Sequence, residues 1–268
     1  MDQFRIKALG GARTTHLSYR PSGPPWPLRH QTPQTTAHDA GLECRAMRTV
    51  LPLVLCLALV APAVAPVQAT RQPVRARRGM VVAMESLATD VGVNVLQQGG
   101  NAVDAAVAVG FALAVTHPFA GNIGGGGYML VRMADGRSTF IDFRERAPEK
   151  STRTMYLDAQ GNPTKDSIEG WKSSGVPGSV RGFEMANTQF GTRTWAQNLQ
   201  PAVDLAVKGY PVSYALAEGL KGSRALANDP ESRRIFQRDG KFFDVGETLS
   251  QPDLGRTLQR IAANGPNE

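Results

Sequence analysis

Residues 96–118 read LQQGGNAVDAAVAVGFALAVTHP, and this stretch decides what kind of fold the chain can form. The glycines at positions 99 and 100 suit the left-handed turn that ends a helix, so one helix is expected to stop there. Asn101 then begins a second helix, with Asp104 in its first turn and Pro118 after its end. Because this second helix is apolar on nearly every side, we expect it to be buried and closely packed against a sheet.

The segments on either side of this stretch add a helix and a hairpin. A helix capped by Ser86 is predicted before the glycine pair, because apolar residues recur every four positions at Leu87, Val91 and Val95. After the buried helix, the glycine-rich residues 121–127 lead into a strand over 128–133. The Asp-Gly pair that follows is typical of a hairpin turn, and residues 138–143 are the returning strand.

The rest of the chain is predicted to be mainly helical. Helices are expected over residues 180–190, capped by Ser179 and stopped by Gly191, and over about 199–208, 214–226 and 254–263. No internal repeat appears. These elements predict an α+β fold in which a buried helix packs against a hairpin.

The N-terminal region has the layout of a secretory signal peptide. Met47 and Arg48 open a short positive region, the apolar run 50–65 follows, and Val67 and Ala69 supply small residues three and one positions before a cleavage point. The run is shorter than the roughly twenty apolar residues that a membrane helix needs, so cleavage is favoured over a retained anchor. We therefore expect a mis-assigned or disordered segment over 1–46, a signal peptide over 47–69, and a mature part over 70–268.

Charge and cysteine content exclude several classes of protein. The net charge of +7 suggests a polyanion partner, but the first 69 residues carry +4 of it, with seven basic and three acidic residues. No basic run interleaved with aromatic residues appears, so we expect no nucleic-acid partner. Both cysteines and three of the four histidines also precede residue 70. This excludes a disulfide scaffold, a cysteine zinc site and a thiol nucleophile in the mature part, and we expect no metal or organic cofactor.

Few side chains in the mature part are candidates for chemistry. The glycine run 121–127 fits neither a P-loop nor Gly-x-Gly-x-x-Gly. Tight packing between the buried helix and the sheet is favoured over a close backbone approach to a ligand or a neighbouring strand. Arg144 shares a strand face with Asp142, which could orient its guanidinium to bind a substrate carboxylate. From the residues alone, a surface Asp–Arg ion pair is favoured over this role. His117 is interpreted as a structural or capping residue, and 175–178 as a turn.

Several motifs in register resemble the γ-glutamyltransferases, also called glutathione hydrolases. They are residues 80–83, 96–106, 121–127, 142–145, 174–178 and 200–202, and the resemblance extends from about Arg78 to Glu268. It implies an N-terminal-nucleophile hydrolase with a four-layer αββα fold, incomplete in this chain, whose exposed threonine attacks the γ-glutamyl bond. By this resemblance Arg144 matches the arginine that binds the α-carboxylate of the substrate.

The same resemblance places the nucleophilic threonine beyond Glu268, so no catalytic residue is assigned here and the chain alone is expected to be inactive. The implied partners are glutathione or another γ-glutamyl compound and the C-terminal half, or small subunit, of the protein. A periplasmic or secreted location is expected, with no membrane span left after cleavage. Two alternatives remain: a cephalosporin or glutaryl acylase of the same superfamily, and a non-catalytic truncated remnant.

Overall fold

The computed structural model describes residues 74–121 and 123–268. The expected upstream segment 1–46, the expected signal peptide 47–69 and Asn122 of the glycine run lie outside the described residues. Residues 76–268 belong to one unit of the chain. No helix in the described ranges is long and apolar enough to cross a membrane.

Helices and strands are mixed along the chain, as the sequence predicts. The helices are α2 (Ser86–Gln97), α3 (Ala102–Thr116), α4 (Ser179–Phe190), α5 (Trp195–Lys208), α6 (Tyr214–Gly222), α7 (Arg224–Asn228), α8 (Pro230–Phe236) and α9 (Pro252–Asn264), with short 3-10 turns η1 (Lys165–Ser167) and η2 (Trp171–Ser173). The strands are β1 (Tyr128–Arg132), β2 (Ser138–Asp142), β3 (Tyr210–Pro211), β4 (Gln237–Arg238), β5 (Lys241–Phe242) and β6 (Thr248–Leu249). They pair as β1–β2, β3–β6 and β4–β5, all antiparallel.

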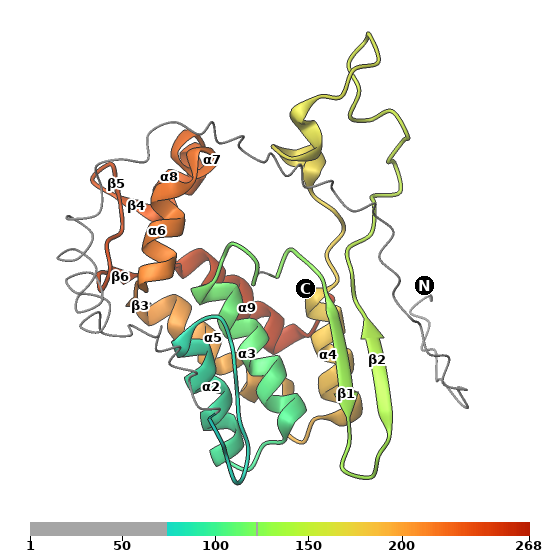
Figure 1. Cartoon of the computed structure of the whole chain (residues 1–268), viewed down its shortest axis with the longest axis vertical. Helices are drawn as coiled ribbons and strands as arrows, with labels where there is room; N and C mark the ends of the chain where they lie inside the picture. Colours follow the sequence, from blue (N-terminus) through green and yellow to red (C-terminus); the bar gives the residue numbers. More distant parts are fainter. Residues whose placement is uncertain (1–73, 122) are drawn as a thin grey trace, which may run out of the picture. The chain divides into compact units, whose positions relative to one another are not determined.

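Helix α3 is the centre of the helical layer. Most of its residues are buried, as its uniformly apolar sequence predicts. Its main neighbours are α2 and α5, with α4 next to it, and Figure 1 shows these helices around it. The expectation that it packs against a sheet was therefore largely wrong. The hairpin reaches the same core only through a few side chains such as Val131 and Ile141, because most of the apolar surface of α3 is covered by other helices.

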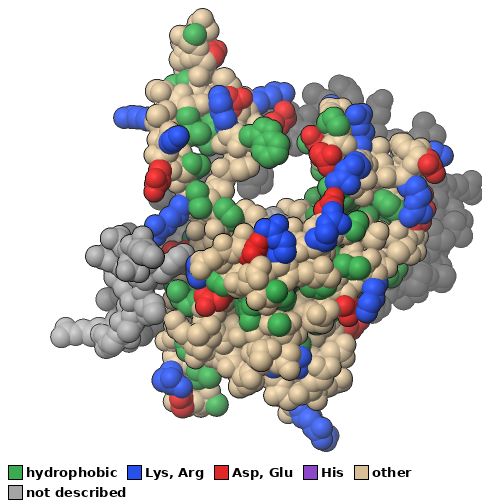
Figure 2. Space-filling model, turned by 180° about the vertical axis from the view of Figure 1, so that it is seen from behind, with side chains coloured by type: hydrophobic (Ala, Val, Ile, Leu, Met, Phe, Trp, Pro, Cys, Tyr) green, Lys and Arg blue, Asp and Glu red, His purple; other side chains and the backbone are tan. Residues whose placement is uncertain are grey.

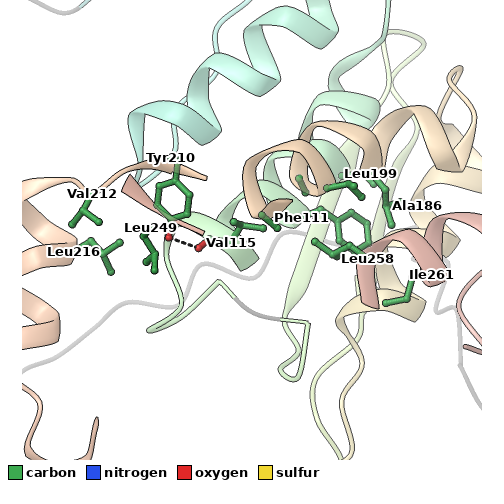
Figure 3. Packing of buried hydrophobic residues seen from close by; sticks show 14 of the residues in the cluster. Phe111, Val115, Ala186, Leu199, Tyr210, Val212, Leu216, Leu249, Leu258 and Ile261 are labelled. Atoms are coloured by element: carbon green, nitrogen blue, oxygen red, sulfur yellow. Dashed lines mark hydrogen bonds between the residues drawn. The ribbon is translucent and has the colours of Figure 1, made fainter. Parts of the chain in front are cut away.

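One large cluster of buried side chains makes up most of the core around α3. Figure 3 shows Phe111 near Leu199, Ala186 and Leu258 at one end of the view, and Tyr210 with Leu249 at the other. The Phe111 ring meets two further aromatic rings edge to face, at centroid distances of 5.1 and 5.3 Å.

A buried hydrogen bond closes the C-terminal end of α3. The Tyr210 hydroxyl donates to the Val115 carbonyl at 2.7 Å, and Gln251 Nε2 donates to the same carbonyl at 2.8 Å. Burial, together with the nearby Glu85 carboxylate, raises the pKa of Tyr210. The hydroxyl therefore stays protonated and donates to a helix carbonyl that has no partner within the helix.

The N-terminal end of α3 is fixed by a buried carboxylate. Asn101 caps the helix, and Asp104 completes a capping box by accepting from the Asn101 N–H at 2.9 Å. The same carboxylate accepts hydrogen bonds from the loop between α4 and α5: the Thr192 N–H and hydroxyl at 3.1 and 2.7 Å, and the Arg193 N–H at 3.1 Å. Asn198 of α5 donates to it as well, at 3.1 Å.

These bonds decide the charge of Asp104. Burial opposes ionisation, but the hydrogen bonds from Thr192, Asn101 and Arg193 outweigh it and lower the pKa of Asp104 to about 2. The carboxylate is fully buried, so it stays ionised in the protein interior. It joins the start of α3 to the loop before α5 and to α5 itself, which lie about ninety residues further along the chain.

The hairpin β1–β2 has one buried face and one open face. Its register pairs Tyr128 with Asp142 and Arg132 with Ser138, and Gly136 in the turn has φ of 89°, which favours glycine. Val131 and Ile141 point into the core, whereas Tyr128, Leu130 and Phe140 on the other face are exposed. The predicted strands and turn are confirmed, and an apolar sheet face is left uncovered within the described residues.

Several predicted helix boundaries needed correction. The N-cap of α2 is Glu85 and that of α4 is Gly178, so Ser86 and Ser179 are the first helical residues and not caps. Helix α5 begins four residues earlier than predicted, because Thr194 forms a capping box that the apolar pattern alone does not reveal. The single helix predicted over 214–226 is broken at Ser223 into α6 and α7, and α8 was not predicted.

Candidate functional site

Arg144 lies just beyond the end of β2, on the open face of the hairpin. Its side chain is exposed, and its Nε lies 3.3 Å from Glu145 Oε2. The Asp142 carboxylate accepts from the main-chain N–H of Arg144 at 3.0 Å. The prediction that Asp142 orients the guanidinium was therefore wrong: Asp142 fixes the backbone, and the neighbouring glutamate contacts the guanidinium.

The first glycine segment holds the backbone on one side of Arg144. The Gly127 and Phe143 N–H groups donate to each other's carbonyls at 3.3 and 3.0 Å, which extends the hairpin ladder by one pair. A Cβ at Gly126 would lie 2.4 Å from the Phe143 carbonyl oxygen, closer than real side chains come. At Gly126 the glycine run therefore makes the close approach to a neighbouring strand that was the less favoured interpretation, since any side chain there would push the two segments apart. Gly121 fits the packing interpretation, because a Cβ there would lie 2.6 Å from the Leu113 Cβ of α3.

The second glycine segment, residues 175–178, holds the other side. Val176 and Arg146 exchange backbone hydrogen bonds at 2.8 and 3.1 Å, and the Gly178 N–H donates to the Gly125 carbonyl at 2.9 Å. A Cβ at Gly178 would lie 2.1 Å from the Phe143 carbonyl oxygen. The interpretation of this segment as a simple turn was incomplete, because its hydrogen bonds tie both glycine segments to the end of β2.

Phe143 supports this arrangement from the core. Its ring is buried and meets Phe183 of α4 edge to face at 5.6 Å between centroids. Gly182, one turn into α4, leaves room for this ring, since a Cβ there would lie 2.3 Å from it. Arg144 is therefore an exposed cation on a backbone that is fixed from three directions. A guanidinium held this way can bind a carboxylate through two hydrogen bonds without first ordering a flexible loop.

Tyr128 is a neighbour of Arg144 that the sequence analysis missed. The Arg144 Cζ lies over the Tyr128 ring, 5.9 Å from its centroid, and Phe140 stacks on the same ring at 5.4 Å. The alternation along one strand places Phe140 and Arg144 on the same face, but only the register across the hairpin adds Tyr128. The Asp-Gly turn was the signal in the sequence that could have revealed Tyr128, because pairing the two strands around this turn places Tyr128 near Arg144.

The other sequence candidates have structural roles. His117 is the C-cap residue of α3, where its main-chain N–H donates to the Leu113 carbonyl. Its Nδ1 lies 3.9 Å from Glu85 Oε1, which confirms the structural interpretation. In residues 74–121 and 123–268 no cluster of three or more His, Cys, Asp or Glu side chains could hold a metal ion. Figure 2 shows basic and acidic side chains intermixed over the face that it presents.

Comparisons with known proteins agree with the resemblance of the motifs. The family model described as gamma-glutamyltranspeptidase matches residues 88–268. The glutathione hydrolase proenzyme of Escherichia coli K12 is 53% identical over 199 residues, which are 73% of this chain and 34% of that protein. The acylase ACY 1 proenzyme of Pseudomonas sp. SE83 is 39% identical over 214 residues, 77% of this chain and 38% of that protein.

A solved structure supports the same relationship. The Helicobacter pylori γ-glutamyltranspeptidase matches with a TM-score of 0.70 and 42% identity, over 72% of this chain and 56% of that one. This likeness bears out the expected N-terminal-nucleophile hydrolase fold, of which the described residues form a part. The chain spans about a third of the length of the curated relatives that it matches.

Proposed function

Because the chain belongs to the γ-glutamyltranspeptidase family, we propose that it is part of a proenzyme that hydrolyses and transfers γ-glutamyl groups. The substrates are glutathione and other γ-glutamyl compounds, and the acceptors are water, amino acids or peptides. This chain supplies part of the substrate site, and the reacting threonine comes from a part of the protein outside residues 1–268. That part, the small subunit after self-cleavage, is the structural partner of this chain.

The observation that supports this function best is the fixed position of Arg144. A γ-glutamyl compound carries its α-carboxylate at the end opposite to the bond that reacts. Gripping that carboxylate at a rigid site holds the γ-carbonyl at a defined distance from the nucleophile, which lowers the entropic cost of the reaction. The exposed guanidinium on a clamped backbone meets this need, since two parallel hydrogen bonds fix direction as well as distance.

The reaction proceeds through an acyl-enzyme. The threonine hydroxyl oxygen bonds to the γ-carbonyl carbon while the free amine of that threonine accepts its proton. The bond between the γ-carbon and the leaving amine then breaks, and the proton passes to the leaving amine. Water or an amino acid next attacks the ester, which releases glutamate or a new γ-glutamyl compound and restores the threonine hydroxyl.

The assignment is tested by replacing Arg144 in the complete proenzyme. In the Arg144→Ala variant, the KM for γ-glutamyl p-nitroanilide is expected to rise well over tenfold, because loss of a charged hydrogen-bonded partner costs about 2–5 kcal/mol. Self-cleavage should persist, since Arg144 contacts the substrate and not the scissile peptide. The matched control is Arg132→Ala, an exposed arginine at the other end of the same hairpin, whose KM should not change.

Two results would contradict the assignment. An unchanged KM in Arg144→Ala would return this arginine to a surface ion pair with Glu145. A wild-type proenzyme that hydrolyses glutaryl amides but not γ-glutamyl amides would favour the acylase alternative, for which the 39% identical acylase relative is the supporting observation. A glutaryl group keeps the terminal carboxylate but lacks the α-amine, so Arg144 serves both substrates.

We also propose that the protein is exported to the periplasm or secreted, with residues 47–69 as its signal peptide. Mass spectrometry of the exported protein should find an N-terminus at Thr70 or a few positions away. Intact peptides from residues 1–46 in the exported protein would contradict both the cleavage and the suggested start at Met47.

A further inference from the structure

We propose that Tyr128 is a positioning residue for Arg144, and that the ring pair it forms with Phe140 sets the plane in which the guanidinium meets a substrate carboxylate. This inference rests on the proposed function and adds to it a determinant of substrate binding. Tyr128 acts through Arg144 and does not itself contact the reacting atoms.

The register of the hairpin brings the two rings and the cation together. Tyr128 pairs with Asp142, and Leu130 pairs with Phe140, so Tyr128 and Phe140 are diagonal neighbours on the open face. Their rings are nearly parallel, with an interplanar angle of 23° and centroids 5.4 Å apart. Arg144 follows Asp142 by two residues and lies on the same face, with its Cζ 5.9 Å from the Tyr128 centroid.

The contacts of the guanidinium leave its terminal nitrogens for a ligand. Its Nε faces Glu145 Oε2 at 3.3 Å, and its Cζ lies over the Tyr128 ring. Within the described part of the chain, no hydrogen bond engages either terminal nitrogen of Arg144. A carboxylate can therefore be bound through both terminal nitrogens at once, while the Tyr128 ring restrains the guanidinium from one side.

The stack prevents rotation that the backbone clamp alone cannot prevent. The glycine segments fix the main chain of Arg144, but the side chain has several rotatable bonds beyond it. Glu145 approaches the guanidinium at Nε. An aromatic ring attracts the cation and presents a flat surface, so it selects the rotamers that lie parallel to the ring. The paired Phe140 ring in turn limits rotation of the tyrosine.

The phenol oxygen plays no part in this role, which provides a sharp control. Tyr128 is 59% exposed, and among the described residues its hydroxyl has no hydrogen-bond partner. Tyr128→Phe should therefore preserve the effect, and Tyr128→Leu should abolish it while keeping an apolar side chain on the sheet face.

The test uses the complete, self-cleaving proenzyme with γ-glutamyl p-nitroanilide as substrate. Tyr128→Leu and Tyr128→Phe are each made alone and combined with Arg144→Gln, and Leu130→Ala serves as a control on the same exposed face. Phe140→Leu is a second probe of the stack. Self-cleavage and thermal melting of each variant report whether it folds.

The expected result is a rise in KM of about threefold to tenfold for Tyr128→Leu with little change in kcat, the size of a partly exposed cation–π contact. Tyr128→Phe should restore the wild-type KM, and Phe140→Leu should raise KM less than Tyr128→Leu does. In the Arg144→Gln background, Tyr128→Leu should have no further effect, because the group that it positions is gone.

Separate outcomes distinguish failure of the inference about Tyr128 from failure of the proposed function. A tenfold rise in KM for Arg144→Gln with no rise for Tyr128→Leu overturns the inference alone. So does a Tyr128→Leu effect that persists undiminished in the Arg144→Gln background, because the tyrosine then acts independently of the arginine. An unchanged KM in Arg144→Gln overturns the proposed function, and the inference falls with it.

Discussion

Replacing Asp104 by asparagine should destabilise the fold strongly, although the two side chains have nearly the same shape. The buried carboxylate is surrounded by donors, from Asn101, Thr192, Arg193 and Asn198. Asparagine replaces one acceptor oxygen by an NH₂ group, which is itself a donor. One donor of the loop before α5 would then face another donor in a site closed to water.

The size of the effect follows from the contacts. Folding lowers the pKa of Asp104 from 3.8 to about 2, and at about 1.4 kcal/mol per pH unit the preference for the charged form is about 2 kcal/mol. A buried donor left without a partner costs a further 1 kcal/mol or so. We expect Asp104→Asn to lower the free energy of unfolding by about 3 kcal/mol at pH 7.

Urea unfolding of the chain measures this loss, and Trp195 is a suitable probe. It is the first residue of α5, and its Nε1 donates to the Ile261 carbonyl at 2.9 Å. Replacing Trp26 and Trp171 by phenylalanine removes the other tryptophan signals. The midpoint should fall with an unchanged slope. Asp135→Asn, at an exposed carboxylate in the hairpin turn, is the matched control and should change the midpoint much less.

The pH dependence gives a second measure. Because the pKa of Asp104 is lowered by folding, its stabilisation is complete above about pH 4 and is lost as the pH falls through about 2. The difference in stability between wild type and Asp104→Asn should therefore be constant near neutral pH and shrink below about pH 4. A loss under about 1 kcal/mol at pH 7, or a difference that does not depend on pH, would refute the reasoning.

Two further substitutions test the packing around the site and the core. Gly178→Ala would bring a Cβ to 2.1 Å from the Phe143 carbonyl oxygen, so it should lower the stability by about 1–3 kcal/mol in thermal melting. Gly222→Ala, with open space around it, should be neutral. Equal melting temperatures of the two variants would contradict the close packing of residues 175–178 against the end of β2. Tyr210→Phe removes a 2.7 Å hydrogen bond to the end of α3 and should lower the stability by about 1–2 kcal/mol. Tyr214→Phe, at an exposed side chain, should have no effect. A melting temperature of Tyr210→Phe that matches the wild type would show that the hydroxyl does not stabilise α3.

The local pattern of the sequence determined the elements and the family. The apolar run after Asn101 predicted a buried helix with its start and end, because a cap and a helical period are properties of neighbouring residues. The Asp-Gly turn predicted the hairpin for the same reason. The order of the motifs sufficed to identify the family, since it depends on no contact in space.

Only the tertiary structure decided how these pieces support one another. The partners of Asp104 lie in a loop and a helix about ninety residues away, and no local pattern specifies them. The role of residues 175–178 changed from a turn to a clamp when Gly178 was found against Phe143. Tyr128 joined Arg144 only through the strand register. Contacts of this kind form when the chain closes on itself, so they depend on the packing of all the elements and not on the residues next to them in sequence.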